Sequence, residues 1–515
     1  RRTRGPQGCV RSSRSGRAER TRLEGRALSM FVVAAALLGF SGEETPAPLR
    51  EETPAPLRRE ALIIFSRHGI RVPYAPPGGI AEYSKAPAAG WFPNASDWGA
   101  EGEAHLTEHG ATVIRRMGAY HRQLLVDSGF LPSDGSKVAV YADDDPTGRD
   151  VKTASAFFDG MLPGVTVRIQ HTASYVQPLF NQGQLNSSMC PGPTEAQVLG
   201  TIGGEPSAIS LANGLAIQRL SDAVGCCRPA VCAKQGGPKQ GGPKQGGPKQ
   251  GGAEGKGEAC TLVEQPTGGW TGLFYQFYRG PFWSAASLAE YLQLLYLNNM
   301  PLGGVAPGLD APQLGSLMLL HQSELDVTED QIATQSFGSD LLAHLLATMQ
   351  QLLLGRSIPG LASRRGDRLV YYAGHDLNLY FLRNFLRLNW LTRSWNMNEA
   401  MPGGMLQFEL LSRAAPATAP RAAGRRAFER APSSGGAWPE ARREHFVKLY
   451  FVSASYEQQR GAAELTLADG PDRAFVTIPQ CASGPEASCP LERFRQLVLS
   501  SIKAECVSTV PVDAL

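Results

Sequence analysis

The sequence predicts an α/β fold in which helices flank a central sheet and a mostly α-helical cap is inserted into the sheet domain. Apolar runs of strand character at 61–65, 138–142 and 369–373 each pass through a few polar residues into a helical stretch. Between the second and third runs, the leucine-rich stretches at 287–296 and 339–353 have helical periodicity. With 515 residues, of which 42% are hydrophobic, the chain can form one large domain or two intimate ones.

The first strand ends in Ser66-Arg67-His68-Gly69-Ile70-Arg71-Val72-Pro73. A histidine between two fixed positive charges is a poor general base, but it is suited to attack an anion that the arginines bind and polarise. Phosphate is the anion that best matches two guanidinium groups. This stretch therefore predicts a phosphate site with His68 as nucleophile. The alternative for these residues alone is a strand-end turn without chemistry.

The other two strands lead to further charged residues. The second continues through 144–148 to Arg149 and a helix, and the third continues into Gly374-His375-Asp376-Leu377-Asn378 and an apolar helix at 379–388. Ligands bind at the carboxyl ends of the strands in an open α/β sheet. We therefore expect one site to contain the charged residues of all three segments: Arg67, His68, Arg71, Arg149, His375 and Asp376.

The predicted sheet domain comprises 60–183 and 360–515, and the predicted cap comprises 184–359. In the cap, Ser287-x-x-Glu290 predicts a capping box that opens one helix, and Ser339 is a candidate cap for a second. His321 is a candidate for the substrate pocket. The Lys-Gln-Gly-Gly-Pro repeat across 234–252 predicts a solvated loop.

Residues 1–59 predict a leader and a spacer outside the fold. An arginine-rich stretch at 1–27 precedes an apolar stretch of about 11 residues at 30–40, which suits a signal peptide better than a membrane span of about 20 residues. A repeated proline-containing octapeptide follows at 43–58. We expect a secreted protein or one in an endomembrane or vacuolar lumen, without a stable membrane span. A signal anchor or an organelle leader is the alternative.

Cysteine usage also favours an oxidising compartment, because eight of the nine cysteines lie beyond the leader. Four of them are expected to form two disulfides whose connectivity the sequence leaves open, and the lack of nearby histidine disfavours zinc: Cys226, Cys227, Cys232 and Cys260. Sequons at Asn94 and Asn186 fit a glycoprotein. A net charge of +3 gives no reason to expect nucleic acid as a partner.

Arg67-His68-Gly69-x-Arg71-x-Pro73 together with Gly374-His375-Asp376-x-Asn378 resembles the histidine acid phosphatases, in the acid phosphatase and phytase branch. The resemblance extends from about residue 60 to about residue 506. It implies a histidine-phosphatase-like sheet domain, a phosphohistidine formed on His68, and Asp376 as the general acid. It also implies a small phosphate monoester as substrate, with no metal or other cofactor. The remaining roles that it implies are phosphate binding by Arg67, Arg71, Arg149 and His375, and the disulfides Cys190–Cys506 and Cys481–Cys489.

The chain departs from this family pattern at three places. Leu377 stands where many relatives have a small polar residue, Tyr74 follows Pro73 where phytate-specialised members often have a basic residue, and 328–331 is acidic and polar where an arginine is expected. Because a substrate with six phosphates prefers extra cations, these departures favour a broad acid phosphatase. Two alternatives stay open: a phytase or other inositol-phosphate phosphatase, and a catalytically weak glycoprotein that binds phosphate esters.

Overall fold

The structure, a computed structural model, describes part of the chain: residues 56–74, 95–173, 176–180, 190–224, 262–302, 306, 309–415 and 443–515. All of these belong to one unit of the chain, Pro54–Leu515. Several predicted features lie outside the described residues: the leader and most of the spacer, the 234–252 loop, both sequon asparagines, and the cysteines at 226, 227, 232 and 260.

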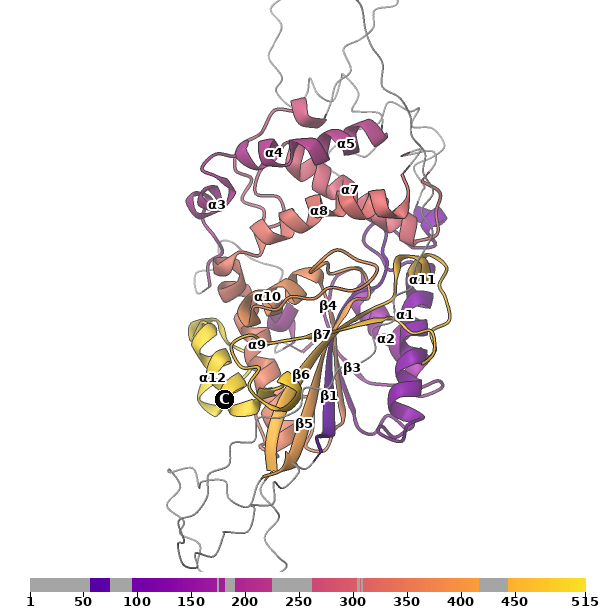
Figure 1. Cartoon of the computed structure of the whole chain (residues 1–515), viewed down its shortest axis with the longest axis vertical. Helices are drawn as coiled ribbons and strands as arrows, with labels where there is room; N and C mark the ends of the chain where they lie inside the picture. Colours follow the sequence, from indigo (N-terminus) through magenta and orange to yellow (C-terminus); the bar gives the residue numbers. More distant parts are fainter. Residues whose placement is uncertain are drawn as a thin grey trace, which may run out of the picture. The chain divides into compact units, whose positions relative to one another are not determined.

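A mixed sheet forms the centre of this unit, as the sequence predicts (Figure 1). Its strands follow the order β3-β2-β4-β1-β5-β6-β7, and β8 pairs with β6. The strands are β1 Arg58–Arg67, β2 Val138–Ala142, β3 Ile169–Gln170, β4 Leu369–Gly374, β5 Met405–Ala414, β6 Arg443–Ser453, β7 Asp472–Val476 and β8 Cys489–Pro490. The pairs of β2, β4 and β1 are parallel, and the pairs formed by β5 and β6 are antiparallel.

The register of the parallel strands brings three chain segments to one edge of the sheet. Arg67 at the end of β1 lies opposite Gly374 at the end of β4, and Ala142 at the end of β2 lies opposite Ala373. The residues that follow these strands therefore start from neighbouring points. This confirms the predicted arrangement of the three strand ends.

Helices cover both faces of the sheet (Figure 1). On one side, α1 (Glu108–His121) and α2 (Arg149–Met161) pack with almost no side chain between them. A Cβ atom at Gly118 would lie 1.9 Å from the Phe157 carbonyl oxygen, so only glycine permits this approach. On the other side lie α9 (Gln331–Leu354), α10 (Asp376–Leu386) and α12 (Leu491–Ser501).

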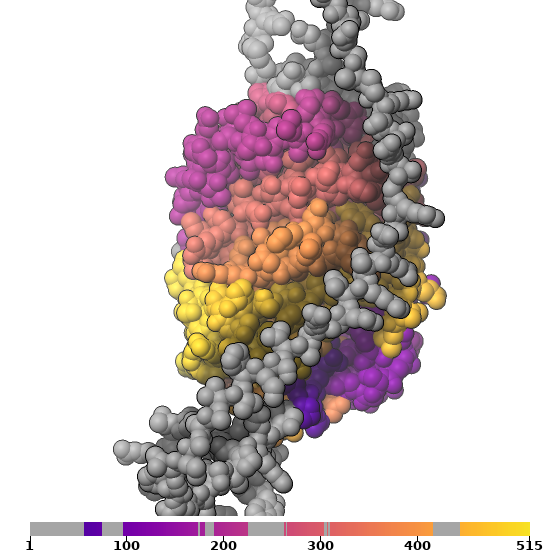
Figure 2. Space-filling view, in the orientation of Figure 1, coloured from indigo at the N-terminus to yellow at the C-terminus, as the bar shows by residue number. Residues whose placement is uncertain are grey.

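The remaining large helices gather beyond the sheet, where the sequence predicts a cap (Figure 1). They are α3 Glu195–Ile202, α4 Ala208–Ala212, α5 Gly214–Val224, α7 Pro281–Leu297 and α8 Ala311–Thr328. On the face shown in Figure 2, cap residues coloured magenta to salmon lie directly against orange residues of the sheet domain. The boundary at 359 stays a prediction, although α9 packs on α10, α12 and β1 of the sheet domain.

Two predicted helix starts are wrong. Helix α7 begins at Pro281, so Ser287 and Glu290 lie inside it and form no capping box. Helix α9 begins after Asp330, whose side chain accepts a hydrogen bond from the Ala333 N–H, whereas Ser339 is buried in the middle of the helix. Both helices are apolar around most of their circumference, so hydrophobic periodicity does not mark where they begin.

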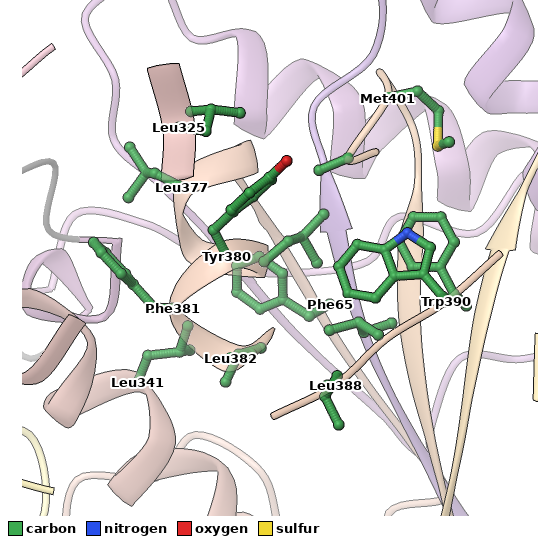
Figure 3. Packing of buried hydrophobic residues seen from close by; sticks show 14 of the residues in the cluster. Phe65, Leu325, Leu341, Leu377, Tyr380, Phe381, Leu382, Leu388, Trp390 and Met401 are labelled. Carbon is green, nitrogen blue, oxygen red and sulfur yellow. The ribbon is translucent and has the colours of Figure 1, made fainter. Parts of the chain in front are cut away.

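An apolar layer joins α10 to the sheet and to the cap (Figure 3). Phe65 of β1, Tyr380 and Leu382 of α10, and Leu341 of α9 are fully buried together. Leu325 of α8 belongs to the same cluster. Burial of a side chain of this size contributes about 1.5–3 kcal/mol, so this layer holds the start of α10 against the end of β1.

Both disulfides implied by the family resemblance are present. Cys190–Cys506 links the beginning of the cap segment to the end of the chain, and Cys481–Cys489 closes a short loop next to β8. Among the described helices, none has the length and hydropathy needed to cross a membrane.

His344 on α9 predicts a pH-dependent weakness in this fold. It is fully buried between Tyr141 and Tyr372, neither ring nitrogen has a hydrogen-bond partner in the part of the chain that the structure describes, and burial lowers its pKa to about 3. The unfolded chain, with a histidine pKa of about 6.5, binds more protons between pH 3 and 6.5, so acidification in that window destabilises the folded state. We expect His344→Leu to reduce the slope of unfolding free energy against pH there by up to about 1.4 kcal/mol per pH unit. Denaturant titrations at several pH values measure this slope, and an unchanged slope would contradict the prediction.

Candidate active site

His68 follows β1 directly and is almost completely buried. Its backbone N–H donates to the Gly374 carbonyl at the end of β4 (2.7 Å), which ties two strand ends together. Its Nδ1 lies 2.9 Å from the Gly69 carbonyl oxygen. Because a carbonyl oxygen only accepts, Nδ1 carries the proton and Nε2 keeps its lone pair for a bond to another atom.

The surroundings of His68 keep it neutral in acid. Burial lowers its pKa well below the usual value, and the charges of Arg149, Arg67 and Arg71 lower it further. A histidine with this pKa retains an unprotonated nitrogen under acidic conditions, in which an ordinary histidine is protonated. Gly69 is required for this geometry, because a Cβ atom there would lie 2.8 Å from the Ile114 side chain.

Arg149 comes to the site as the first residue of α2, following Gly148 in the left-handed conformation (φ 65°). One of its guanidinium nitrogens lies 3.3 Å from His375 Nδ1, and another lies 3.2 Å from Asp145. The guanidinium also receives support from Asp150, whose carboxylate lies 3.6 Å from Nε. Carboxylates thus orient this buried arginine from behind while it lines the pocket.

His375 and Asp376 occupy the start of α10, three residues before the predicted helix start. The His375 backbone N–H donates to the Asn378 side chain (3.0 Å), which explains why the Gly-His-Asp-x-Asn motif includes the asparagine. His375 Nε2 lies 2.7 Å from Asp143 Oδ2. Since an arginine cannot accept a hydrogen bond, Nδ1 accepts from Arg149 and Nε2 donates to Asp143.

These side chains meet at one cavity of about 390 Å³. Its lining includes five of the six charged residues that the sequence predicts to converge: His68, Arg71, Arg149, His375 and Asp376. The sixth, Arg67, reaches the same cluster through Asp376 Oδ2, 2.7 Å from its Nη2. The remaining wall is partly aromatic and apolar, and its residues are Tyr74, Tyr275, Gln276, Ser287, Glu290, His321, Glu324, Leu325, Thr328 and Leu377.

Glu290 is the pocket residue that the sequence interpretation misses, because it assigns Glu290 to a capping box. Its Oε1 lies 2.8 Å from Arg67 Nη2 and 3.0 Å from Arg71 Nη2. Burial opposes its ionisation, but Arg71, His321 and Arg67 outweigh burial and lower its pKa to about 2. A usable signal exists in the sequence: Glu290 is the one charged residue of α7, and a charge on such an apolar helix requires a buried partner.

His321 on α8 lines the cavity, as the sequence analysis anticipates. Its Nδ1 lies 3.1 Å from Glu324 Oε2, and its Nε2 lies 3.9 Å from both Glu290 Oε1 and Asp376 Oδ2. The cap therefore contributes one imidazole and two carboxylates to a site whose arginines come from the sheet domain.

Two groups of carboxylate and imidazole atoms among the described residues are compact enough to hold a metal ion: Asp143, Asp150 and His375, and Glu290, His321 and Asp376. Arg149 faces the first group and Arg67 faces the second. A guanidinium supplies the positive charge that a metal would bring, so we interpret both groups as ion-pair networks. The absence of a metal or other cofactor from the reaction stays a prediction.

Comparison with known proteins supports the resemblance seen in the motifs. The sequence matches none of the protein-family models. It is 25% identical over 459 residues to phytase AppA of Escherichia coli. This alignment covers 85% of this chain and 90% of that phytase. Together with the two motifs, this similarity over most of the chain supports the histidine acid phosphatase family. The chain is accordingly a phosphatase, a hydrolase of phosphate esters of the histidine acid phosphatase type.

Three further relatives agree with this reading. A 125-residue stretch, 23% of this chain and 28% of the relative, is 32% identical to glucose-1-phosphatase of Salmonella typhimurium. The fold matches Hafnia alvei phytase in complex with tartrate at a TM-score of 0.66 and 21% identity, over 88% of this chain and all of that one. The structure of Citrobacter braakii phytase matches at a TM-score of 0.64 and 20% sequence identity. This match covers 87% of this chain and 99% of that one. At these identities, the two structures show that this histidine acid phosphatase shares their fold.

Glu290 predicts a measurable competition with phosphate for the arginines. With a pKa of about 2, it is ionised at pH 5 and repels an incoming phosphate. We expect Glu290→Gln to lower the inhibition constant of inorganic phosphate by about tenfold, which corresponds to about 1.4 kcal/mol. The control is Glu464→Gln, which removes an exposed carboxylate paired with Arg116. We expect it to leave the inhibition constant of phosphate unchanged. Weaker phosphate binding in Glu290→Gln would instead mean that Glu290 mainly orients the arginines.

Proposed function

We propose that the cavity hydrolyses small phosphate monoesters through a covalent phosphohistidine on His68. The lone pair of His68 Nε2 attacks phosphorus, and the bond from phosphorus to the ester oxygen breaks. The observation that carries this proposal is a neutral imidazole, protonated on Nδ1 and buried among three arginines. Such a group is a nucleophile in acid, where its positively charged surroundings attract a phosphate anion.

Arg67, Arg71 and Arg149 bind the non-bridging phosphate oxygens in this proposal, and His375, the fourth predicted phosphate-binding residue, acts by holding Arg149 through Nδ1 in the tautomer described above. Charge spread over those oxygens in a loose transition state is stabilised by donors that are already in place. The support for this role is geometric, because Asp143, Asp145 and Glu290 hold these donors by hydrogen bonds or ion pairs at 2.7–3.2 Å. Asp376 is the proposed general acid for the leaving oxygen, and in the second step it accepts a proton from the attacking water.

We propose a broad acid phosphatase, with phytase as the second candidate. Relatives named phytase and glucose-1-phosphatase support both. Away from His68, the described lining carries Tyr74, Tyr275, Leu325 and Leu377, and its charged cap residues include two carboxylates. The described lining residues include no lysine that could bind the further phosphates of an inositol polyphosphate. A neutral alcohol or aryl group, by contrast, fits this wall.

The wider setting is also a proposal. Two disulfides in the described region support secretion or an endomembrane or vacuolar lumen, where disulfides persist. We expect a small phosphate monoester as the partner, and no nucleic acid. The proposed division is a sheet domain of 60–183 and 360–515 that supplies the reacting groups, with a cap of 184–359 that supplies Glu290 and His321.

Phosphate release from p-nitrophenyl phosphate and from phytate, measured at pH 3–8 without added metal, tests this function. We expect acid activity on the aryl ester, slower release from phytate, and a loss by a factor of about 10³ or more in His68→Ala. His109→Ala, at a histidine outside the cavity, is the matched control. A folded protein that binds phosphate but hydrolyses neither ester would favour the catalytically weak binding protein. Faster sequential release from phytate would favour the phytase.

The role of Asp376 is separable from that of His68. A proton donor matters most when the leaving group is a strong base, so Asp376→Asn should slow an alkyl ester such as glycerol 2-phosphate by about 100-fold or more. p-Nitrophenyl phosphate, whose leaving group needs little protonation, should slow by less than about tenfold. The kcat values of both esters measure this difference. Equal losses on the two esters would remove Asp376 from the general-acid role.

A further inference from the structure

Asp376 is poorly prepared for the role of an acid in the unliganded protein. Its Oδ2 lies 2.7 Å from Arg67 Nη2. Although burial favours its neutral form, Arg67 and His321 hold its pKa well below the usual value. A carboxylate in this state has no proton to give, so the reaction needs a second proton-carrying group close to Asp376.

His321 is placed to be that group. Its Nε2 lies 3.9 Å from Asp376 Oδ2, is shielded from solvent and has no hydrogen-bond partner among the described residues. A movement of about 1 Å brings the two atoms within hydrogen-bond distance. Its other nitrogen, Nδ1, is held by Glu324 one helical turn away on α8. The ring is thus hydrogen-bonded on one side, and on the other side its Nε2 faces the carboxylates of Asp376 and Glu290, each 3.9 Å away.

We infer that His321 is the proton reservoir of the active site, which loads Asp376 before leaving-group departure, and that Glu324 is its positioning residue. This inference rests on the proposed function and adds to it a cap residue in the proton path.

The charges around His321 come from several parts of the fold. Glu290 of α7, Glu324 of its own helix and Asp376 of α10 face the ring, and Glu399 interacts with it from the loop after α10. Burial alone would lower the pKa of His321, but Glu290, Asp376 and Glu324 outweigh burial and raise it to about 10. The ring therefore carries its proton throughout the acidic range in which His68 is neutral.

Substrate binding supplies the trigger for the transfer. A phosphate that engages Arg67 competes with Asp376 for the same guanidinium and brings negative charge to the site. Both changes raise the proton affinity of Asp376, so a proton moves from His321 Nε2 to the carboxylate within a coupled pair.

The proton balance closes over one turnover. In the first step, the phosphorus–oxygen ester bond breaks as the bond from phosphorus to His68 Nε2 forms, and the leaving oxygen takes the proton from Asp376. His321 is then neutral. In the second step, a water oxygen bonds to phosphorus, the bond from phosphorus to nitrogen breaks, and Asp376 accepts the water proton and returns it to His321. No oxidant, reductant or other reactant is consumed.

The leaving-group dependence of His321→Ala tests this inference. We expect kcat to fall by about tenfold or more on glycerol 2-phosphate and by less than about threefold on p-nitrophenyl phosphate at pH 5. Added imidazole should restore the loss on the alkyl ester in His321→Ala but not in Asp376→Asn. Glu324→Gln should show the same selectivity more weakly. Ser323→Ala, at a half-buried residue of the same helix that does not line the cavity, is the matched control and keeps wild-type rates.

A double variant separates the proton path from mere packing. If His321 acts through Asp376, then Asp376→Asn with His321→Ala turns over the alkyl ester no more slowly than Asp376→Asn alone. The inference would be overturned if the double variant lost activity by the product of the two single-variant losses. It would also be overturned if His321→Ala lost the same activity on both esters and imidazole restored neither. Near wild-type rates on both esters would also overturn it while leaving the proposed function intact. Rejection of that function would instead require retained activity in His68→Ala or a folded wild-type protein that hydrolyses neither ester.

Discussion

Positive charge concentrated around a buried histidine is the constraint on which the site depends. Burial lowers the pKa of His68 most, and three guanidinium groups lower it further, because the surroundings screen their charge less than water does. A buried cluster of cations is unstable by itself, so each arginine has a carboxylate partner: Glu290 for Arg67 and Arg71, and Asp145 for Arg149. The partners on the sheet side orient the donors, while Glu290 stands where a phosphate must compete with it.

Close backbone contacts make this concentration of charge possible. His68 and Gly374 share a hydrogen bond across two parallel strands, and a Cβ atom at Gly374 would lie 2.6 Å from the Phe180 ring. The apolar layer beneath α10 holds the first turn of that helix against the strand ends (Figure 3). Precise placement of the charged side chains therefore comes from neutral contacts beneath them, since Coulomb attraction alone has little directional preference.

The cap adds acidic and titratable groups to a site whose cations come from the sheet domain. Glu290, His321 and Glu324 stand on two cap helices, and they connect to the sheet domain through Arg67, Arg71 and Asp376. In the function that we propose, this division has a meaning. The sheet domain provides the groups that react with phosphate, whereas the cap provides walls that discriminate among alcohols and charges that regulate where protons reside.

The sequence by itself determined the fold class, the three strand ends and the six charged residues that follow them, because each signal is local: an apolar run, a turn and a helix. It also determined two disulfides through family resemblance. It did not determine the helix starts at 281 and 331 or the role of Glu290. A Ser-x-x-Glu pattern has the same letters at a helix start and inside a helix, and only tertiary packing decides between them. The pairing of Glu290 with two arginines and the approach of His321 to Asp376 likewise depend on segments more than 50 residues apart, so their distances exist only in the folded chain.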